Sequence, residues 1–166
     1  MSPVDRGRGD VTRAAASIRE VGDIAAEHRV RLALEFNSQA EQWNGLGPIR
    51  EVMATAGHPN CGLLLDTYHL QRSGARPADL DDVAPGEIAY VQFSDVPSSG
   101  LEPGKALDRL PPGKGLVPFR EIFRRLVDKG YRGAMSYEAP NPAAWARPAE
   151  EVAREALVAT RALLAR

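Results

Sequence analysis

Residues 61–66 read Cys-Gly-Leu-Leu-Leu-Asp, an apolar run that ends in a carboxylate. Its length and composition are typical of a strand that is covered on both faces. Three similar runs occur along the chain, and each ends in a polar side chain: Arg31-Leu-Ala-Leu-Glu35, Ala89-Tyr-Val-Gln92 and Ala134-Met-Ser-Tyr-Glu138. Parallel strands place their chemistry at their carboxyl ends, so four such ends predict one shared site.

The order of the elements supports a parallel sheet. Strands are predicted at 30–36, 61–66, 88–93 and 133–138. Helices are predicted before, between and after them, at 11–28, 48–56, 78–83, 117–129 and 148–166. Strands that alternate with helices indicate βαβ units, and therefore an α/β fold with parallel strands.

Side-chain alternation gives each predicted strand two unlike faces. The face that carries the terminal polar groups is mostly small, with residues such as Ala33, Gly62 and Ser136. The opposite face is bulky and apolar, with residues such as Leu63 and Val91. A small face with polar ends suits the tight interior of a barrel, while the bulky face is expected to meet the covering helices.

Composition limits the classes of function. The 166 residues fit one domain over 11–166, with residues 1–10 as a flexible N-terminus. A net charge of −1 argues against a nucleic-acid or membrane partner held by bulk charge. No apolar run approaches the roughly 20 residues that span a bilayer. The single cysteine, Cys61, excludes an internal disulfide framework and indicates a cytoplasmic protein.

The predicted site consists of oxygen ligands alone. Glu35, Asp66 and Glu138 would repel one another unless their pKa values rose or a cation neutralised them, and Gln92 adds an amide oxygen. Such a set favours Mg²⁺, Mn²⁺ or a similar hard divalent ion. The alternative interpretation is that the acidic residues only cap the loops that follow the strands.

Two further residues are candidates for substrate contacts. His69 lies three residues after Asp66, at the rim of the predicted site. Arg109 precedes Leu-Pro-Pro-Gly in a long Gly/Pro-rich loop over 96–115, where it could hold a substrate oxygen or carboxylate. The alternatives are a structural histidine and a solvated loop arginine. The GxGxxG, P-loop, CxxC, HExxH and GxSxG motifs are absent from the sequence, so nucleotide binding and serine or thiol hydrolysis have no motif support.

Five stretches together resemble one family: ALEFN (33–37), HPNCGLLLDTYHLQRSG (58–74), IAYVQFSDVP (88–97), RLPPGKG (109–115) and GYRGAMSYEAPNP (130–142). They are similar to the xylose-isomerase-like TIM barrels, the superfamily of sugar (phosphate) isomerases and epimerases that also holds the AP endonuclease family 2 barrels. The resemblance implies a (β/α) barrel. It also implies that Glu35, Asp66 and Glu138 hold a divalent metal, with Mn²⁺, Mg²⁺ or Co²⁺ favoured over Zn²⁺.

The resemblance also implies a reaction. The family moves a proton next to a carbonyl of a small keto-sugar or polyol, which gives Glu35 and Glu138 catalytic roles and lets His69 and Arg109 bind the substrate. Gln92 stands where many members have histidine, and this resembles the branch with 3-dehydroshikimate-dehydratase-type enzymes, where glutamine is the ligand. The alternative reaction is therefore a metal-dependent dehydration of a 3-dehydroshikimate- or inosose-like substrate. The endonuclease branch fits poorly, because it uses a histidine-rich multi-zinc site and a basic groove, and this chain has three histidines.

The chain corresponds to only half of such a barrel. A complete (β/α)₈ barrel has eight strands, and four are predicted here, which match the family's C-terminal half. A half-barrel leaves two edge strands unpaired, so we expect a truncated gene product, a homo-oligomer or pairing with a missing N-terminal half. A further alternative is an inactive remnant that keeps the ligands without the pocket.

Overall fold

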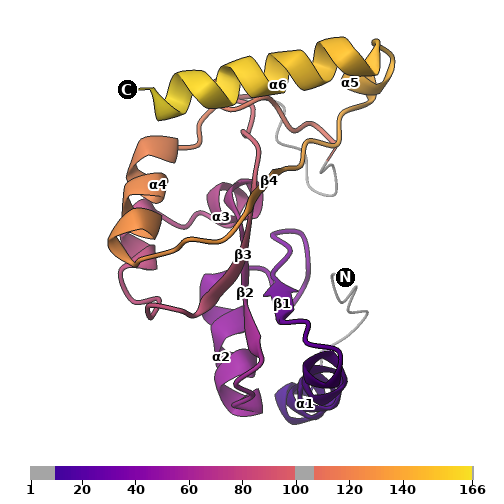
Figure 1. Cartoon of the computed structure of the whole chain (residues 1–166), viewed down its shortest axis with the longest axis vertical. Coiled ribbons are helices and arrows are strands. Elements are labelled where there is room, and N and C mark those ends of the chain that lie inside the picture. The colour runs from indigo at the N-terminus through magenta and orange to yellow at the C-terminus, as the bar shows by residue number, and fades with distance from the viewer. Residues whose placement is uncertain (1–9, 100–106, 166) are drawn as a thin grey trace.

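The computed structural model describes residues 10–99 and 107–165, and it shows one parallel sheet with helices around it (Figure 1). The strands are β1 (Leu32–Glu35), β2 (Cys61–Asp66), β3 (Ile88–Phe93) and β4 (Met135–Tyr137). The sheet order is β1-β2-β3-β4, and every neighbouring pair is parallel. This confirms the predicted α/β fold with four strands of a TIM-barrel type.

The helices follow the predicted alternation, with two additions. They are α1 (Val11–Glu27), α2 (Leu46–Ala56), α3 (Thr67–Arg72), the 3₁₀ turn η1 (Pro77–Leu80), α4 (Phe119–Asp128), α5 (Pro142–Trp145) and α6 (Ala149–Leu164). The helix predicted at 78–83 is a 3₁₀ turn that begins and ends earlier. The sequence analysis missed α3 and α5, because a helix of four to six residues is too short to show a hydrophobic period.

The predicted helix boundaries have physical causes. Asp10 caps α1, since its side chain accepts a hydrogen bond from the Thr12 amide at 2.8 Å. Gly57 ends α2 in the left-handed conformation, with φ of 58°.

The two faces of the sheet differ as side-chain alternation predicts. Leu63, Leu65 and Val91 are fully buried in the core beneath the helices. On the other face, Leu64 and Tyr90 pair across β2 and β3 and are only half-buried. Met135 departs from the prediction, because it lies on the edge strand β4 and is 38% exposed.

The elements are spread along the long axis of the molecule (Figure 1). α1 and α2 lie at one end, and α6 runs across the other end. Among the described residues, no helix has the length and apolar character needed to cross a membrane. Residues 1–9, most of the predicted N-terminal segment, lie outside the described part of the chain.

Candidate metal and proton-transfer site

Asp66 lies at the centre of the site. It ends β2 and caps α3, with Oδ1 accepting a hydrogen bond from the Tyr68 amide at 2.8 Å. The side chain is completely buried. The other carboxylate oxygen, Oδ2, accepts a hydrogen bond from Arg109 Nη1 at 2.6 Å. A buried carboxylate is therefore held by an amide on one side and a guanidinium on the other.

Arg109 joins three of the predicted residues. Its Nη1 also donates to Glu138 Oε2 at 2.9 Å, and its Nη2 lies 3.2 Å from His69 Nε2. Only 5% of Arg109 is exposed, so it is not a solvated loop arginine. The guanidinium lies between the carboxylates and partly balances their charge.

The surroundings of Glu35 raise the pKa of its carboxyl. Burial first, and then the negative charges of Asp66 and Glu138, raise the pKa of its carboxyl from 4.5 to about 7, while Arg109 opposes the shift. The side chain, 17% exposed, lies at the end of β1 with Oε1 3.9 Å from His69 Nε2. A carboxyl with a pKa near neutrality can give up or accept a proton at neutral pH.

His69 is held in a defined orientation. Its Nδ1 accepts a hydrogen bond from the Ser38 amide at 3.3 Å and lies 2.9 Å from Ser38 Oγ. An amide and a guanidinium can only donate, so the Ser38 amide at Nδ1 and Arg109 Nη2 at Nε2 place a donor against each ring nitrogen. Burial lowers the pKa of His69 to about 4, and Arg109 adds to this effect while Asp66 opposes it. The ring is therefore neutral at pH 7.

Gln92 lies beside Asp66, and its oxygen is unused. The two residues are register partners on β3 and β2, so their side chains lie on the same face of the sheet. The Gln92 Oε1 atom is buried and has no hydrogen-bond partner. A buried amide oxygen without a partner costs free energy, which a cation bound there would recover.

The donor set fits a divalent cation. Ligand atoms of Glu35, Asp66 and His69 all lie within 4.8 Å of one another. The unpaired Gln92 oxygen and the Glu138 carboxylate lie at the ends of the next two strands. Oxygen-rich sets of this kind suit hard divalent ions, and His69 offers a nitrogen to the same space.

The segment that carries Arg109 is pinned by a buried carboxylate. Asp95, fully buried, exchanges two backbone hydrogen bonds with Leu110, at 2.8 and 3.0 Å. Its side chain accepts hydrogen bonds from the amides of Val96, Gly115 and Val117 at 2.8 to 2.9 Å. On the other side, Asn141 Nδ2 donates to the Arg109 carbonyl at 3.0 Å. Arg109 thus projects from a fixed segment.

The structure brings together Glu35, Asp66, His69, Arg109 and Glu138, and it places Gln92 at the same sheet edge. Sequence reasoning missed Ser38, Tyr68, Asp95 and Asp108, which support these residues. Asp66 before a helix was a usable capping signal for α3. The contacts of Ser38 and Asp108 depend on loop placement, which no local pattern encodes.

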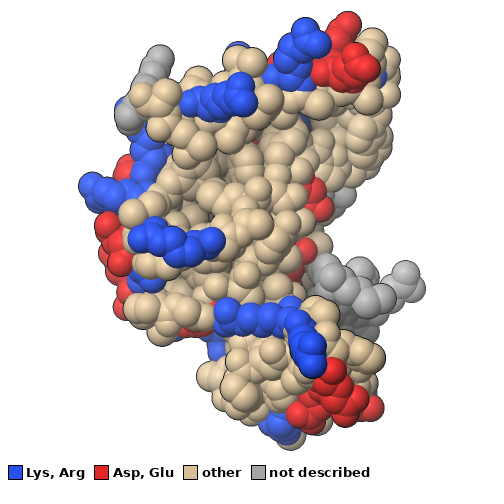
Figure 2. Space-filling model, viewed as in Figure 1, with Lys and Arg blue, Asp and Glu red and all other residues tan. Residues whose placement is uncertain are grey.

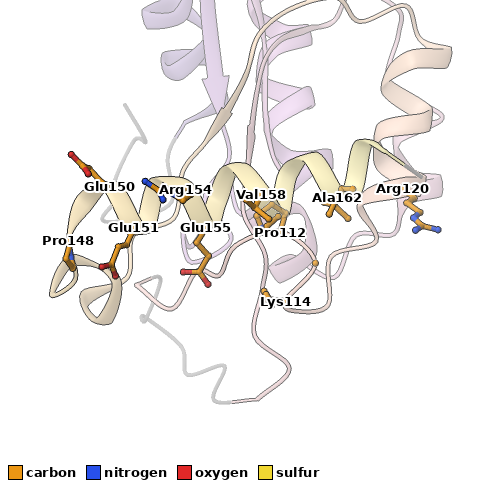
Figure 3. A pocket seen from close by; sticks show the side chains of 13 residues that line it. Pro112, Lys114, Arg120, Pro148, Glu150, Glu151, Arg154, Glu155, Val158 and Ala162 are labelled. Atoms are coloured by element: carbon orange, nitrogen blue, oxygen red, sulfur yellow. The ribbon is translucent and has the colours of Figure 1, made fainter.

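A separate groove lies away from this site. A hollow of about 870 Å³ is lined by α6 and the 112–114 segment, with Arg154 and Val158 among its walls (Figure 3). It includes none of the predicted site residues. Figure 2 shows acidic and basic side chains at both ends of the visible face and along its left edge, with further basic side chains across its middle.

Comparison with known proteins places the chain among (β/α) barrels. The model of the family described as xylose isomerase-like TIM barrel matches residues 2–163. An inosose isomerase from Halalkalibacterium halodurans is 28% identical over 151 residues, which cover 90% of this chain and 54% of the relative. A 3-dehydroshikimate dehydratase from Pseudomonas putida is 25% identical over 154 residues, which cover 90% of this chain and 24% of the relative.

A solved structure shows the same fold. The crystal structure of the IolI protein with a bound zinc atom superimposes with a TM-score of 0.86 and 23% identity, over 96% of this chain and 59% of the other. The chain thus spans about half the length of the inosose isomerase and of the zinc-bound structure, and about a quarter of the dehydratase.

Proposed function

The chain belongs to the xylose isomerase-like TIM barrel family, and from this premise we propose that it carries the metal-dependent proton-transfer site of a sugar (phosphate) isomerase or epimerase. The substrate is a small keto-sugar or polyol, and the proton moves next to its carbonyl. The observation that carries the proposal is the convergence of Glu35, Asp66 and His69, whose ligand atoms lie within 4.8 Å of one another, beside the buried Gln92 oxygen. Inosose isomerase among the relatives supports the choice of reaction.

The metal is proposed to be held by Glu35, Asp66, Gln92 and Glu138. The unpaired Gln92 oxygen supports this set, as does the convergence of three carboxylates near one arginine. We propose Mn²⁺, Mg²⁺ or Co²⁺, because the set contains oxygen atoms only. When bound, such an ion polarises a carbonyl and an adjacent hydroxyl of the substrate.

The chain's own residues supply the proton movements and the orientation. Glu35 takes or returns the proton beside the carbonyl, because its carboxylate lies at the end of β1 next to His69 and Asp66. Glu138, 39% exposed and directly after the opposite edge strand β4, serves the other face of the substrate. His69 offers a ring nitrogen, and Arg109 offers its guanidinium, to substrate oxygens.

A dehydratase is the second candidate, and Gln92 favours it. The amide stands at the end of β3 in a chain that is also similar to a 3-dehydroshikimate dehydratase. Removal of the same proton followed by loss of a β-hydroxyl as water gives a conjugated enone. The proposed place of action is the cytoplasm, where the unpaired Cys61 thiol stays reduced.

The test is proton exchange with solvent. The chain is loaded with Mn²⁺ and incubated in deuterated water with an inosose, a keto-hexose or 3-dehydroshikimate. Proton NMR then follows the signal of the carbon next to the carbonyl, and ultraviolet absorbance follows enone formation. The isomerase proposal predicts deuterium at that carbon without an enone, whereas the dehydratase predicts an enone.

The control variant is Glu155→Gln, which changes an exposed carboxylate outside the site. It is expected to exchange at the rate of the unaltered chain, while Glu35→Gln abolishes exchange. Absence of both exchange and enone, in a chain that still binds Mn²⁺, would favour the inactive remnant.

A further inference from the structure

We propose that Tyr68 and Asp108 are positioning residues that hold the Arg109 guanidinium in the site, through the ring face of Tyr68 and the bond between its hydroxyl and Asp108. The inference rests on the proposed function only in assigning Arg109 to the substrate. The positioning itself can be measured without turnover.

The Tyr68 ring forms one wall around Arg109. Tyr68 is completely buried, and Arg109 Cζ lies 4.4 Å from the centre of its ring. A guanidinium over an aromatic face is attracted by the ring quadrupole, and the attraction is strongest where water is excluded. Arg109, itself 5% exposed, meets this condition.

The hydrogen bonds of Arg109 leave a part of its side chain unheld. Nη1 contacts Asp66 and Glu138, and Nη2 contacts His69, but the buried Nε atom has no hydrogen-bond partner. The bonds therefore act only at the tip of the guanidinium. The aromatic face supplies the remaining constraint on its plane, which decides where the Nη groups point.

The hydroxyl of Tyr68 is tied to the segment that carries Arg109. It donates a short hydrogen bond to Asp108 and accepts one from Arg72 Nη1 at 3.1 Å. Arg72 Nη1 also donates to Asp108 Oδ2 at 3.3 Å. Because Asp108 directly precedes Arg109, this triad fixes the chain at the residue before the arginine.

The triad has a role that a packed apolar ring could not fill. The Tyr68 hydroxyl donates to Asp108 and accepts from Arg72, so it uses both of its hydrogen-bonding functions. A phenylalanine would fill the same space without joining α3 to the 107–110 segment. Buried polar networks specify one arrangement when every member has a partner, as each side chain of the triad does here.

The experiment observes the guanidinium directly. The full chain is labelled with ¹⁵N, and the Arg109 side-chain N–H signals are assigned by their loss in Arg109→Gln. In the unaltered chain we expect slow rotation of the guanidinium and separate Nη signals. Tyr68→Leu is expected to merge or broaden them, whereas Tyr68→Phe, which keeps the ring and loses the Asp108 bond, is expected to give an intermediate change.

The second measurement is the steady-state kinetics of each variant, on the substrate that the unaltered chain turns over in the proton-exchange test. Tyr68→Leu and Asp108→Asn are expected to raise KM by about tenfold or more, with a smaller change in kcat. Mn²⁺ affinity is expected to stay within about threefold, below the loss typical of a side chain that bonds a metal ligand, since the Tyr68 hydroxyl and Asp108 bond each other and Arg72. Tyr131→Phe is the matched control, because it removes a tyrosine hydroxyl that donates to the Ala134 carbonyl at 2.6 Å, outside the proposed site.

The outcomes separate the two claims. If the Arg109 signals and KM in Tyr68→Leu match those in Tyr131→Phe, the positioning role is wrong. If Tyr68→Leu does not fold, Asp108→Asn decides, because the Asp108 side chain is 26% exposed and its replacement leaves the core intact. If the unaltered chain turns over no substrate, the proposed function fails, while the NMR comparison still decides the positioning.

Discussion

At the scale of single residues, Glu35 and His69 show how burial shapes the site. The pKa of Glu35 is raised from 4.5 to about 7, and that of His69 is lowered from 6.5 to about 4, with burial the largest cause of both. Both side chains are thus favoured as neutral groups when no cation is bound. A carboxyl with a pKa near 7 can exchange its proton at neutral pH, and a neutral imidazole can donate or accept a hydrogen bond there.

The two shifts predict opposing pH dependences of stability in the metal-free chain. The folded chain holds the Glu35 proton more tightly than the unfolded chain, so between pH 4.5 and 7 this group lowers the free energy of unfolding as pH rises. The folded chain releases the His69 proton more easily, so between pH 4 and 6.5 that group raises the free energy of unfolding as pH rises. Each contribution is roughly 3 kcal/mol, and they nearly cancel between pH 4.5 and 6.5.

Urea unfolding of two variants, in a buffer that contains a chelator, separates the contributions of Glu35 and His69 to the free energy of unfolding. Relative to the unaltered chain, Glu35→Gln is expected to make the free energy of unfolding rise with pH across this window, because only the His69 term remains. His69→Gln is expected to make it fall. Parallel pH profiles for both variants and the unaltered chain would show that the two groups are not buried as described.

At the scale of elements, the strand ends were predictable and the loops were not. Alternation along β2 and β3 identified which side chains face the helices, and Leu63, Leu65 and Val91 are buried accordingly. The sequence analysis missed helix α3, because it begins directly after Asp66 and has only six residues. The burial of Arg109 could not be predicted from its own segment. It depends on the hydrogen bonds that Asp95 and Asn141, from other segments of the chain, make with residues 109 and 110.

Asp95 is expected to be the main anchor of the loop after β3. Asp95→Asn replaces a carboxylate oxygen, which accepts an amide hydrogen, by an NH₂ group that cannot accept, so a buried donor loses its partner. We expect a loss of about 3 kcal/mol in the free energy of unfolding by urea, together with faster hydrogen exchange at the Gly115 amide. Asp81→Asn is the control, with an expected loss below about 1 kcal/mol, since that carboxylate pairs with Arg125 at the surface. Equal losses in the two variants would refute the anchoring role.

At the scale of the whole molecule, the sheet is open. β1 and β4 are edge strands, and the face that would line a barrel leaves Leu64 and Tyr90 only half-buried. The alternation of side chains along the strands predicted this face. The sequence also predicted four strands, which are too few to close a barrel. What covers the face is not encoded by any local pattern.

Association is the expected consequence of this open sheet. Unpaired edges of parallel strands and a half-buried apolar face favour pairing with a second copy or with another barrel half. Size-exclusion chromatography with light scattering is expected to give a mass above that of one chain, increasing with concentration. A compact species with the mass of a single chain at all concentrations would contradict this expectation.

The central claim is that the four strand ends form one divalent-metal site. Isothermal titration calorimetry with Mn²⁺ tests it most directly, with Glu35→Gln, Gln92→Ala and Glu138→Gln as site variants and Glu155→Gln as the exposed control. The account predicts one Mn²⁺ per chain, at least about tenfold weaker binding in each site variant, and unchanged binding in the control. Absence of Mn²⁺ binding, or equal binding by the site variants and the control, would contradict it.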